Sequence, residues 1–335
     1  MSTIKDVAKL AGVSPSTVSR VLNGDGPSPA SEKTKERIWE AVRKTGYSAN
    51  ESARNLRKQE SSSSPTDQAI DCILARELDF FIDPFLSSLR HVMEESLFKK
   101  GYSLRSQFGL SDLNNHTNAE SKRRDAAIIL GRIDAASLKI VKANYRHLVY
   151  TGLQDLDLGI DGVICSGYSA VTSAMDYLVS LGHKKICYLG ETKDEQRYLA
   201  YLDKVREYGI DTNPNLTVDV LFTPSDSYEG LRKALDQGLD CTAILCANDV
   251  SSIGVIKALK EYRISIPGEI SIIGINDVEN IRYLEPMLTT ISIPIEEMGN
   301  HVAKLLVDRI MQNHFTPVKM YIPSHLTKRD SCARV

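Results

Sequence analysis

Residues 4–23 read IKDVAKLAGVSPSTVSRVLN, and this stretch decides the fold of the N-terminal region. Apolar residues at Ile4, Val7, Ala8 and Ala11 recur with a helical period, which predicts a short amphipathic helix. Gly12 interrupts the pattern at a point where a positive φ is easily adopted. Ser14 followed by Pro15 is typical of an N-cap and the first residue of a second helix. Two short helices joined by a tight turn predict a helix-turn-helix, which places its second helix in the DNA major groove.

The following residues complete a small domain around this motif. Residues 31–45 (SEKTKERIWEAVRKT) predict a third helix that turns Ile38, Ala41 and Val42 inward and ends before Gly46. A domain of under about fifty residues can just build a core from such side chains. Residues 50–57 (NESARNLR) predict a short helical stretch whose apolar stripe is too short to fold alone.

These segments resemble the DNA-binding headpiece of the LacI/GalR family of bacterial transcription regulators. The resemblance rests on TIKDVAKLAGVSPSTVSRVLN, the third helix, the GY pair and the pattern N-x-x-A-R-x-L. It implies base reading by Pro15, Ser16 and Arg20, and phosphate contacts from Ser14, Thr17, Ser19 and Asn23. Arginine suits the O6/N7 edge of guanine and small hydroxyls suit phosphate oxygens, whereas proline offers only apolar contact.

The resemblance also implies a hinge helix, which folds in the minor groove when two subunits meet on the operator. Ala53 and Leu56 occupy the hinge positions where an apolar wedge kinks DNA at an unstacked step. The predicted DNA-binding set is Thr3, Ser14, Pro15, Ser16, Thr17, Ser19, Arg20, Asn23, Asn50, Ala53, Arg54 and Leu56. We therefore expect a headpiece at residues 1–47, a hinge helix at 48–59 and a serine-rich linker at 60–68 (ESSSSPTDQ).

Composition and charge fit a DNA-binding protein with an ordinary globular body. The chain has 335 residues, 42% of them hydrophobic and 25% charged, which suggests two or three domains. Residues 1–58 hold eleven Lys and Arg against six Asp and Glu, and the remainder holds 30 against 37. A basic head fits phosphate binding. No run approaches the roughly 18 apolar residues of a membrane helix, and no signal sequence opens the chain, so we expect a cytoplasmic protein.

The six cysteines predict neither a metal centre nor a redox pair. Cys72, Cys165, Cys187, Cys241, Cys246 and Cys332 form no C-x-x-C motif. Five of them fall in or beside apolar strand-like runs, where a free cysteine acts as a small hydrophobe.

Beyond residue 68, strand-like and helical patterns alternate to the end of the chain. Strands are predicted at residues 69–75, 102–105, 126–130, 147–150, 162–165, 185–189, 217–221, 243–246, 270–275, 289–293 and 319–322. Helices are predicted at 84–100, 135–143, 169–181, 195–208, 227–237, 250–262 and 295–312. Such alternation indicates parallel sheets covered by helices on both faces. The fold class is therefore an all-α helix-turn-helix headpiece plus an α/β core of two doubly wound parallel-sheet lobes.

This region is similar to the effector-binding core of the same family, which shares its fold with periplasmic binding proteins. The similarity rests on LVSLGHKKICYLGE and on residues 241–299, CTAILCANDV to IPIEEMG. It implies an effector-binding and dimerisation core at 69–325 in which the chain crosses three times between discontinuous lobes. We expect one lobe at about 69–160 with a share of 294–322, and the other at about 161–293.

Ligands of open parallel sheets bind beyond the carboxyl ends of the strands. The polar and aromatic residues that follow the predicted strands are therefore candidates for effector binding. The set is Asp83, Phe85, Thr151, Arg197, Phe222, Asn248 and Asn276. Amides, a carboxylate, a guanidinium and aromatic rings suit the hydroxyl pairs and the C–H face of a sugar. Taken singly, Asp83, Asn248 and Asn276 fit a helix cap or a turn equally well.

Two departures from the family pattern concern the effector. Asn276 and Thr151 stand where many members carry aspartate. In this chain a charged carboxylate is therefore replaced by a neutral and weaker hydrogen-bonding group at each position. The segments ARELDFFIDPF and INDVENIRYLEP look most like regulators of galactose and β-galactoside operons, and they favour a galactoside effector.

The resulting hypothesis is a homodimeric repressor of a carbohydrate-utilisation operon that binds a pseudo-palindromic operator and is released by a sugar. Corepression, in which the ligand tightens DNA binding, is the alternative within the family. An enzyme on the same fold would need a motif such as G-x-G-x-x-G, a Walker loop or G-x-S-x-G, and none is present, so no cofactor is expected. A transport binding protein would carry a secretory signal and lack a headpiece.

Overall fold

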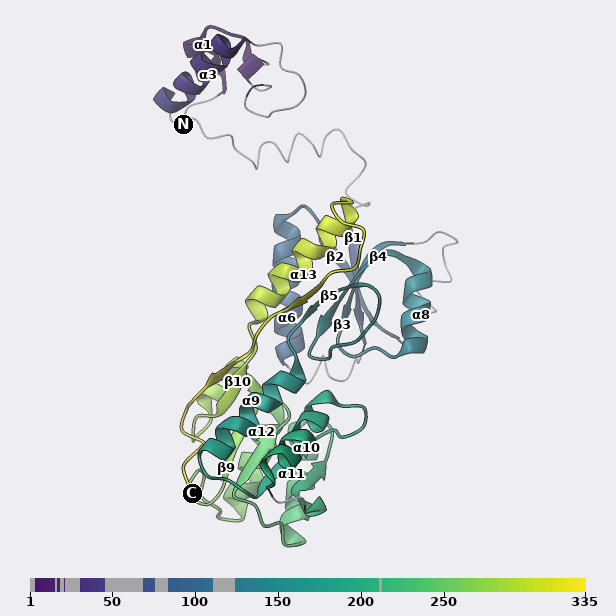
Figure 1. The fold of residues 1–335 in the computed structure, drawn as a ribbon, viewed down its shortest axis with the longest axis vertical. Helices are drawn as coiled ribbons and strands as arrows, with labels where there is room; N and C mark the ends of the chain where they lie inside the picture. Colours follow the sequence, from purple (N-terminus) through teal and green to yellow (C-terminus); the bar gives the residue numbers. More distant parts are fainter. Residues whose placement is uncertain are drawn as a thin grey trace. The chain divides into compact units, whose positions relative to one another are not determined.

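The computed structural model describes residues 4–15, 17, 18, 21, 31–45, 69–75, 84–110, 124–210 and 213–335. The chain divides into two compact units, Met1–Asp67 and Gln68–Val335. The first unit contains helices α1 (Ile4–Ala11) and α3 (Glu32–Thr45), and the second contains all the described strands (Figure 1).

The first unit has a small core of its own. Val7, Ala8 and Ala11 of α1 pack with Val18 and with Ile38 and Ala41 of α3, and all six are buried. Gly12 ends α1 with φ +63°, which confirms the predicted turn. Ser14 Oγ accepts from Thr17 N at 3.2 Å, so Ser14 caps the helical residues that begin at Pro15, as predicted.

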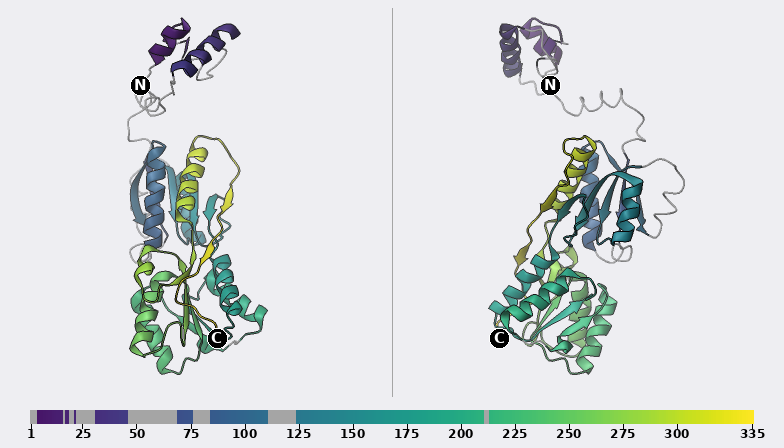
Figure 2. Two further views of the ribbon diagram at one scale, coloured as in Figure 1. Left: turned by 90° about the vertical axis from the view of Figure 1, so that its left-hand side faces the viewer. Right: turned by 45° about the vertical axis from the view of Figure 1, so that its right-hand side comes forward.

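The first lobe of the second unit is built on one parallel sheet. Its strands are β1 (Ala69–Leu74), β2 (Ser103–Gly109), β3 (Arg124–Leu130), β4 (Tyr145–Gly152), β5 (Asp161–Ile164) and β11 (Lys319–Tyr321), in the order β11-β5-β4-β3-β1-β2. Helices α6 (Pro84–Lys99) and α13 (Ile295–Ile310) lie side by side on one face, and α8 (Ala135–Asn144) covers the other (Figures 1 and 2). Alternate residues face the two layers: Cys72 and Ile128 pack under α6 and α13, whereas Ile73 and Ile129 pack under α8.

The second lobe repeats this plan. Its strands are β6 (Ile186–Gly190), β7 (Thr217–Asp219), β8 (Ala243–Cys246), β9 (Ser271–Asn276), β10 (Thr289–Ser292) and β12 (His325–Thr327), in the order β12-β10-β9-β8-β6-β7. Helices α9 (Gly167–Ser180) and α10 (Gln196–Tyr208) pack together, as do α11 (Pro224–Asp236) and α12 (Asp249–Glu261). Short 3₁₀ helices span Pro214–Leu216 and Glu279–Tyr283. The two lobes give the predicted fold class of doubly wound α/β layers.

The chain passes between the lobes after β5, after β10 and after β11, and this pattern corrects two predictions. Strand β5 was expected in the second lobe, but it pairs with β4 and β11 and so belongs to the first. Strand β12 was not predicted, and it pairs antiparallel with β10, so the second sheet is not purely parallel.

The segment after β12 also packs on the second lobe, beyond the predicted end of the core at residue 325. Ser331 donates to Ile272 O at 2.6 Å and accepts from Thr289 N at 2.8 Å. Val335 N donates to Leu181 O at 3.2 Å, so the core extends to the last residue.

Asp161 ties three separate segments of the first lobe together. Its buried carboxylate accepts from Arg309 Nε at 2.8 Å, from Arg309 Nη2 at 2.6 Å and from Val318 N at 2.7 Å. His314 Nε2 lies 2.9 Å from the same carboxylate. Burial alone would raise the pKa of Asp161, but the hydrogen bonds and the charge of Arg309 lower it. The end of α13 and the strand β11 are thereby fixed to β5.

The cysteines are all free thiols. Cys72, Cys165, Cys187, Cys241 and Cys246 are buried, and Cys332 is partly buried. Burial raises the pKa of Cys72, Cys165 and Cys241 to about 12. Among the described residues, no group of three or more His, Cys, Asp or Glu could hold a metal ion. In the same residues, no helix is long and apolar enough to cross a membrane.

Candidate functional site

Few of the predicted DNA-binding residues lie in the described part of the first unit. Ser14 and Pro15 are exposed at the start of the second helix, and Thr17 is partly exposed. Ser14 Oγ lies 2.8 Å from Thr17 Oγ1, so two hydroxyls meet at this helix end. The remaining predicted residues lie outside the described residues: Thr3, Ser16, Ser19, Arg20, Asn23, Asn50, Ala53, Arg54 and Leu56.

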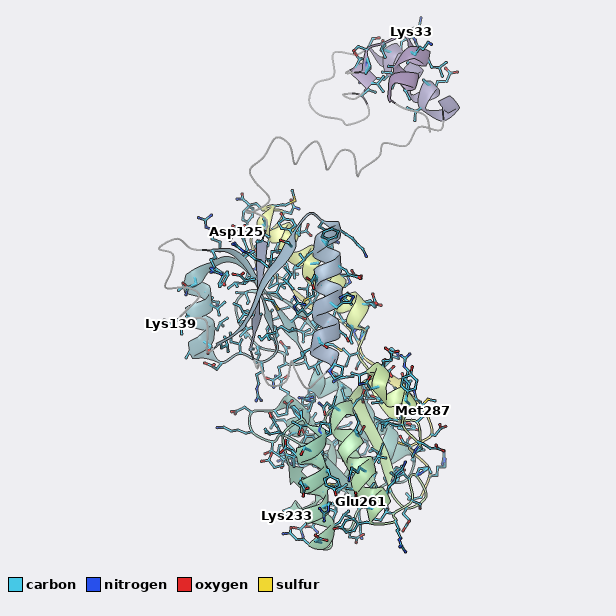
Figure 3. The ribbon with its side chains drawn as sticks, turned by 180° about the vertical axis from the view of Figure 1, so that it is seen from behind. Lys33, Asp125, Lys139, Lys233, Glu261 and Met287 are labelled. Carbon is cyan, nitrogen blue, oxygen red and sulfur yellow. The ribbon has the colours of Figure 1, made fainter. Side chains whose placement is uncertain are left out.

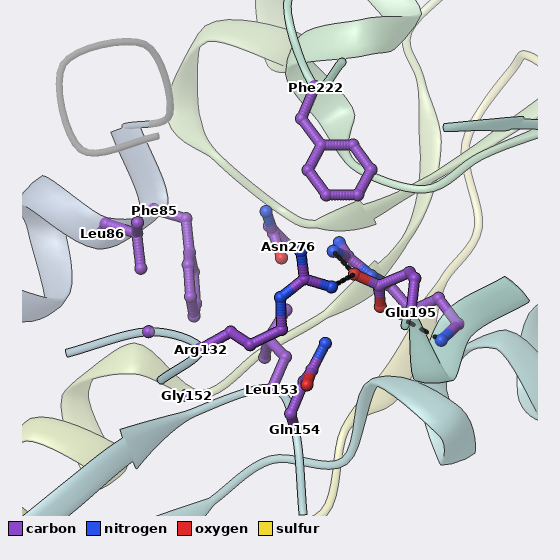
Figure 4. A pocket seen from close by; sticks show the side chains of 11 residues that line it. Phe85, Leu86, Arg132, Gly152, Leu153, Gln154, Glu195, Phe222 and Asn276 are labelled. Atoms are coloured by element: carbon purple, nitrogen blue, oxygen red, sulfur yellow. Dashed lines mark hydrogen bonds and ion pairs between the residues drawn. The ribbon is translucent and has the colours of Figure 1, made fainter. Parts of the chain in front are cut away.

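In the second unit, a cavity lies between the lobes at the carboxyl ends of the strands. Four of the seven predicted effector residues line it, and they come from both lobes: Phe85 from the first, and Arg197, Phe222 and Asn276 from the second. Phe85 is the second residue of α6, Phe222 follows β7, and Asn276 is the last residue of β9. Figure 4 shows the Phe85 and Phe222 rings on opposite sides of Asn276 and Arg132. We call this space the inner cavity.

Arg197 is fixed at the wall of the inner cavity by several contacts. Its Nε and Nη2 donate to the two oxygens of Glu195 at 2.8 and 3.0 Å, and its Nη1 donates to Ala247 O at 2.6 Å. The guanidinium carbon lies 4.3 Å from the centre of the Phe222 ring, a cation–π contact. Burial would raise the pKa of Glu195, but the charge and hydrogen bonds of Arg197 lower it. The cavity wall therefore carries an ionised pair with no net charge.

Two further predicted effector residues, Thr151 and Asn248, do not line this cavity. Thr151 lies on β4 and is fully buried. Asn248 accepts from Ser251 N at 3.0 Å and caps α12, the structural role that its sequence context also allowed. Asp83 lies outside the described residues.

Three polar lining residues were missed by sequence analysis: Arg132, Gln154 and Glu195. Arg132 follows β3 in the first lobe, and its Nη1 donates across the cleft to the carbonyl oxygens of Lys193 at 3.2 Å and Asp194 at 2.9 Å. Gln154 follows β4, and its Nε2 donates to Asp194 O at 3.4 Å. The same rule of strand ends could have found Arg132 and Gln154, because each follows a predicted strand within a few residues.

Buried tyrosines support the loops that carry these residues. Tyr150 on β4 donates to Gln154 O, and Tyr188 on β6 donates to Glu191 O, both at 3.0 Å. Gly152 has no side chain because a Cβ there would come within 2.9 Å of the Tyr150 hydroxyl. Each loop is thus anchored to the strand that precedes it.

Asn276 is held in an unusual backbone conformation. It has φ +122° and the next residue, Asp277, has φ +59°. Asp277 accepts from Arg329 Nη2 at 2.5 Å and from Ser292 Oγ at 2.8 Å. The surrounding structure therefore fixes this strained turn, which brings the Asn276 amide to the cavity.

The inner cavity combines two aromatic rings, an amide and a neutralised ion pair. Aromatic faces suit the C–H surface of a sugar ring, while an amide and a guanidinium suit its hydroxyl groups. Glu195 neutralises Arg197, and Glu191 lies 3.4 Å from the second lining arginine, Arg132. Because both guanidinium groups have a carboxylate partner, the cavity is suited to an uncharged polar ligand rather than to an anion.

Comparison with known proteins gives consistent matches over the whole chain. Residues 3–50 match the bacterial regulatory proteins of the lacI family, and residues 175–332 match a periplasmic binding protein-like domain. The HTH-type transcriptional repressor PurR of Pasteurella multocida (strain Pm70) is 31% identical over 325 residues, covering 92% of each chain. The repressor MelR of Bacillus subtilis (strain 168) is 27% identical over 347 residues, covering 99% of this chain and 98% of MelR.

Two solved structures show the same fold over nearly the full length. A complex of the transcriptional regulator CelR with cellobiose aligns with a TM-score of 0.71 at 23% identity, covering 99% of this chain and 100% of CelR. A lac repressor dimer bound to operator and the anti-inducer ONPF aligns with a TM-score of 0.70 at 22% identity, covering 99% of each chain.

Proposed function

The chain belongs to the lacI family of bacterial regulatory proteins, and we propose that it represses a carbohydrate-utilisation operon until a neutral sugar binds between its lobes. Membership of this family makes it a DNA-binding transcriptional repressor with an effector-binding domain, and not an enzyme. The identity of the effector, the operator and the dimeric state are parts of the proposal.

The proposal for DNA binding assigns roles along the N-terminal region. Ser14 and Thr17 contact phosphates at the exposed helix end, and Ser16 and Arg20 read bases in the major groove. Residues 48–59 form the hinge helix, with Leu56 as the wedge in the minor groove. Two copies of the chain present two headpieces to the two halves of a pseudo-palindromic operator.

The proposal for the effector rests on one observation, the residues that line the inner cavity. Phe85 and Phe222 offer aromatic surface from opposite lobes, and the Asn276 amide lies between them. Arg197 adds a hydrogen-bonding group to the lining. A ligand that contacts both lobes can bind more tightly to one arrangement of the lobes than to another. Switching requires such a difference in affinity between the two states. We favour a galactoside because of the sequence segments at residues 75–85 and 275–286.

Operator binding titrated with sugars tests this proposal. An operator is first selected from random duplex DNA, and binding of the purified full-length protein is followed by fluorescence anisotropy. Galactose, lactose, allolactose and glucose are then added. We expect a galactoside to release the protein from DNA. Tighter DNA binding with sugar would show corepression instead, and intact DNA binding with no response to any sugar would overturn the assignment.

A matched pair of variants connects the response to the inner cavity. Phe222→Leu removes an aromatic face from the cavity, so we expect sugar affinity to fall about fivefold to tenfold while operator binding stays unchanged. Phe315→Leu makes the same change at a phenylalanine that is 77% exposed and lines no described cavity. If both variants weaken sugar binding equally, the ligand does not lie on Phe222.

A further inference from the structure

Exposed cations gather at one end of the first lobe, where its strands begin. Lys99 ends α6 and Lys100 follows it on the way into β2, Arg105 is the third residue of β2, and Arg146 is the second residue of β4. All four residues are exposed. Because parallel strands begin at the same edge of a sheet, the four share one end of the lobe, opposite the cleft. We call these four residues the basic end.

The charges of the basic end are not compensated within the described residues. In this part of the chain, none of the four side chains takes part in a hydrogen bond or an ion pair. Arg124 begins β3 at the same end, but Asp71 neutralises it at 2.6 Å. Asp125, the next residue, is an exposed carboxylate there. In the sequence, residues 122–123 (KR) directly precede β3 and add two further cations. Positive charge therefore predominates at this end, although residues 59–335 as a whole hold 30 basic and 37 acidic residues.

Helix dipoles explain only part of this arrangement. A cation in the last turn of a helix is stabilised by the partial negative charge of the helix end. This effect accounts for Lys99 in the last turn of α6 and for Lys142 in the last turn of α8. It does not account for Arg105 and Arg146, because these two residues lie on strands.

The cations at the opposite end of the strands are treated differently. In the cleft, Arg197 pairs with Glu195 at 2.8 Å, and Arg132 pairs with Glu191 at 3.4 Å. Those guanidinium groups are neutralised by the protein itself. The unpaired charges of the basic end are instead available to an anionic partner outside the chain.

The spacing of the basic end fits the backbone of duplex DNA. The strand order β4-β3-β1-β2 places three steps between the strands of Arg146 and Arg105. At about 4.8 Å a step, the two strands lie about 14 Å apart. The major groove of DNA is about 12 Å wide, so cations spread over this distance can face the phosphates on both of its sides.

The connection of the chain brings DNA to this end. The second unit begins at Gln68, and β1 begins at Ala69, which pairs with Ser103 at the start of β2. The chain therefore joins the DNA-binding unit to the second unit at the basic end. A tether of this kind raises the effective concentration of bound DNA near the point of attachment.

We propose that the basic end of the first lobe binds backbone phosphates of the same duplex to which the headpieces bind. It adds affinity but no sequence preference, because phosphate contacts carry no sequence information. The inference rests on DNA binding by the first unit and does not depend on the effector.

Two double variants of the full-length protein test the inference by fluorescence anisotropy with the selected operator. Lys100→Gln with Arg146→Gln removes two charges from the basic end. We expect operator affinity to fall about tenfold, and the slope of log affinity against log salt to become shallower by at least about 1. Lys233→Gln with Arg334→Gln removes the same charge from exposed residues of the second lobe, and it should change operator affinity less than about twofold. Lys233 lies at the opposite end of the second unit from Asp125 (Figure 3).

The comparison of the two double variants decides between a local contact and a general effect of charge. Equal weakening of operator binding by both would overturn the inference, as would unchanged binding by the variant of the basic end. Circular dichroism and analytical ultracentrifugation of both variants check that fold and oligomeric state are retained.

Acetylation of lysines in the wild-type protein gives a readout that needs no variant. Saturating operator DNA should slow the acetylation of Lys99 and Lys100, measured by mass spectrometry, and leave that of Lys233 unchanged. Acetylation of Lys99 and Lys100 at the same rate with and without operator would overturn the inference. A protein that selects no operator from random duplex DNA would instead contradict the proposed function.

Discussion

Arg197 shows how one residue sets the character of the inner cavity. An isolated guanidinium there would favour an anionic ligand, but Glu195 neutralises it through two hydrogen bonds. The pair is buried, with Arg197 8% and Glu195 2% exposed. Removing one partner of such a pair leaves an uncompensated charge and costs more than the pair itself contributes.

Arg197→Met is therefore expected to destabilise the second unit by about 3 kcal/mol at neutral pH. In the wild type the pKa of Glu195 is lower in the folded than in the unfolded protein. This difference stabilises the fold at a pH above the unfolded pKa, and the stabilisation is lost as the pH falls through the folded pKa. In the variant burial dominates, the pKa of Glu195 is raised, and protonation at low pH removes the penalty. Urea denaturation followed by circular dichroism should show a difference that shrinks toward pH 4.

The control for this change is Arg206→Met on the same helix. The Arg206 side chain is 71% exposed and pairs with Asp203, so the loss should stay within about 0.5 kcal/mol. An Arg197→Met protein as stable as the Arg206→Met protein would show that the buried pair is not required.

At the residue scale, the sequence predicts which residues reach the inner cavity where the position depends only on the end of a strand. Phe85, Arg197, Phe222 and Asn276 reach the inner cavity because parallel strands place their carboxyl ends at one edge. The rule does not say which way a side chain turns. Asn248 follows a strand too, but its oxygen is used by the backbone of α12. Arg132 also follows a strand, but its partners, the carbonyls of residues 193 and 194, belong to the other lobe, so the sequence does not show that it bridges the cleft.

At the scale of elements, the packing of α11 against α12 depends on one glycine. A Cβ at Gly254 of α12 would come within 2.0 Å of Pro224 O and 2.8 Å of Tyr228 N. Both atoms belong to the backbone of α11, which cannot move aside as a flexible side chain can. The glycine thus allows two helices to approach closely.

Gly254→Ala should destabilise the second unit by about 2–3 kcal/mol, although alanine favours a helix by about 1 kcal/mol. Urea denaturation measures the loss. Gly209→Ala is the comparison: Gly209 ends α10 with φ +57° and has open space around it. Its cost should be only about 1 kcal/mol, from backbone strain. The packing argument would be refuted by a Gly254→Ala protein that is the more stable of the two.

Most elements could be predicted from periodicity, whereas pairing across distant segments could not. Strand β5 was assigned to the wrong lobe because its partners β4 and β11 are fixed only by tertiary structure. Strand β12 (HLT) is short and not strongly apolar, so no pattern indicated a strand. Its antiparallel pairing follows from the third passage of the chain between the lobes.

At the scale of the whole molecule, charge separates the two binding functions. Residues 1–58 hold eleven basic and six acidic residues, while the rest of the chain holds 30 and 37. In the second unit, charges of both signs, such as Asp125, Lys139, Lys233 and Glu261, are exposed on the surface (Figure 3). Lys33 is exposed on α3 of the first unit.

Operator binding and effector binding should therefore respond differently to salt. Two headpieces that neutralise about six to ten phosphates would lose at least about 10³-fold in operator affinity between 50 and 200 mM salt. Affinity for a neutral sugar should change less than about twofold over that range. Anisotropy and calorimetry measure the two slopes. A steep salt dependence of effector binding would indicate a charged effector.

The buried thiols can report how often the core of the unmodified chain opens. A thiol with a pKa near 12 forms almost no thiolate at neutral pH, and burial keeps reagents away from it. Cys72 and Cys165 lie in or directly after strands of the first lobe, and Cys187 and Cys246 lie in strands of the second. Each thiol can therefore be alkylated only when its own strand is transiently exposed. The alkylation rates measure how often each lobe opens, and the change in these rates on adding a ligand measures how strongly the ligand suppresses opening.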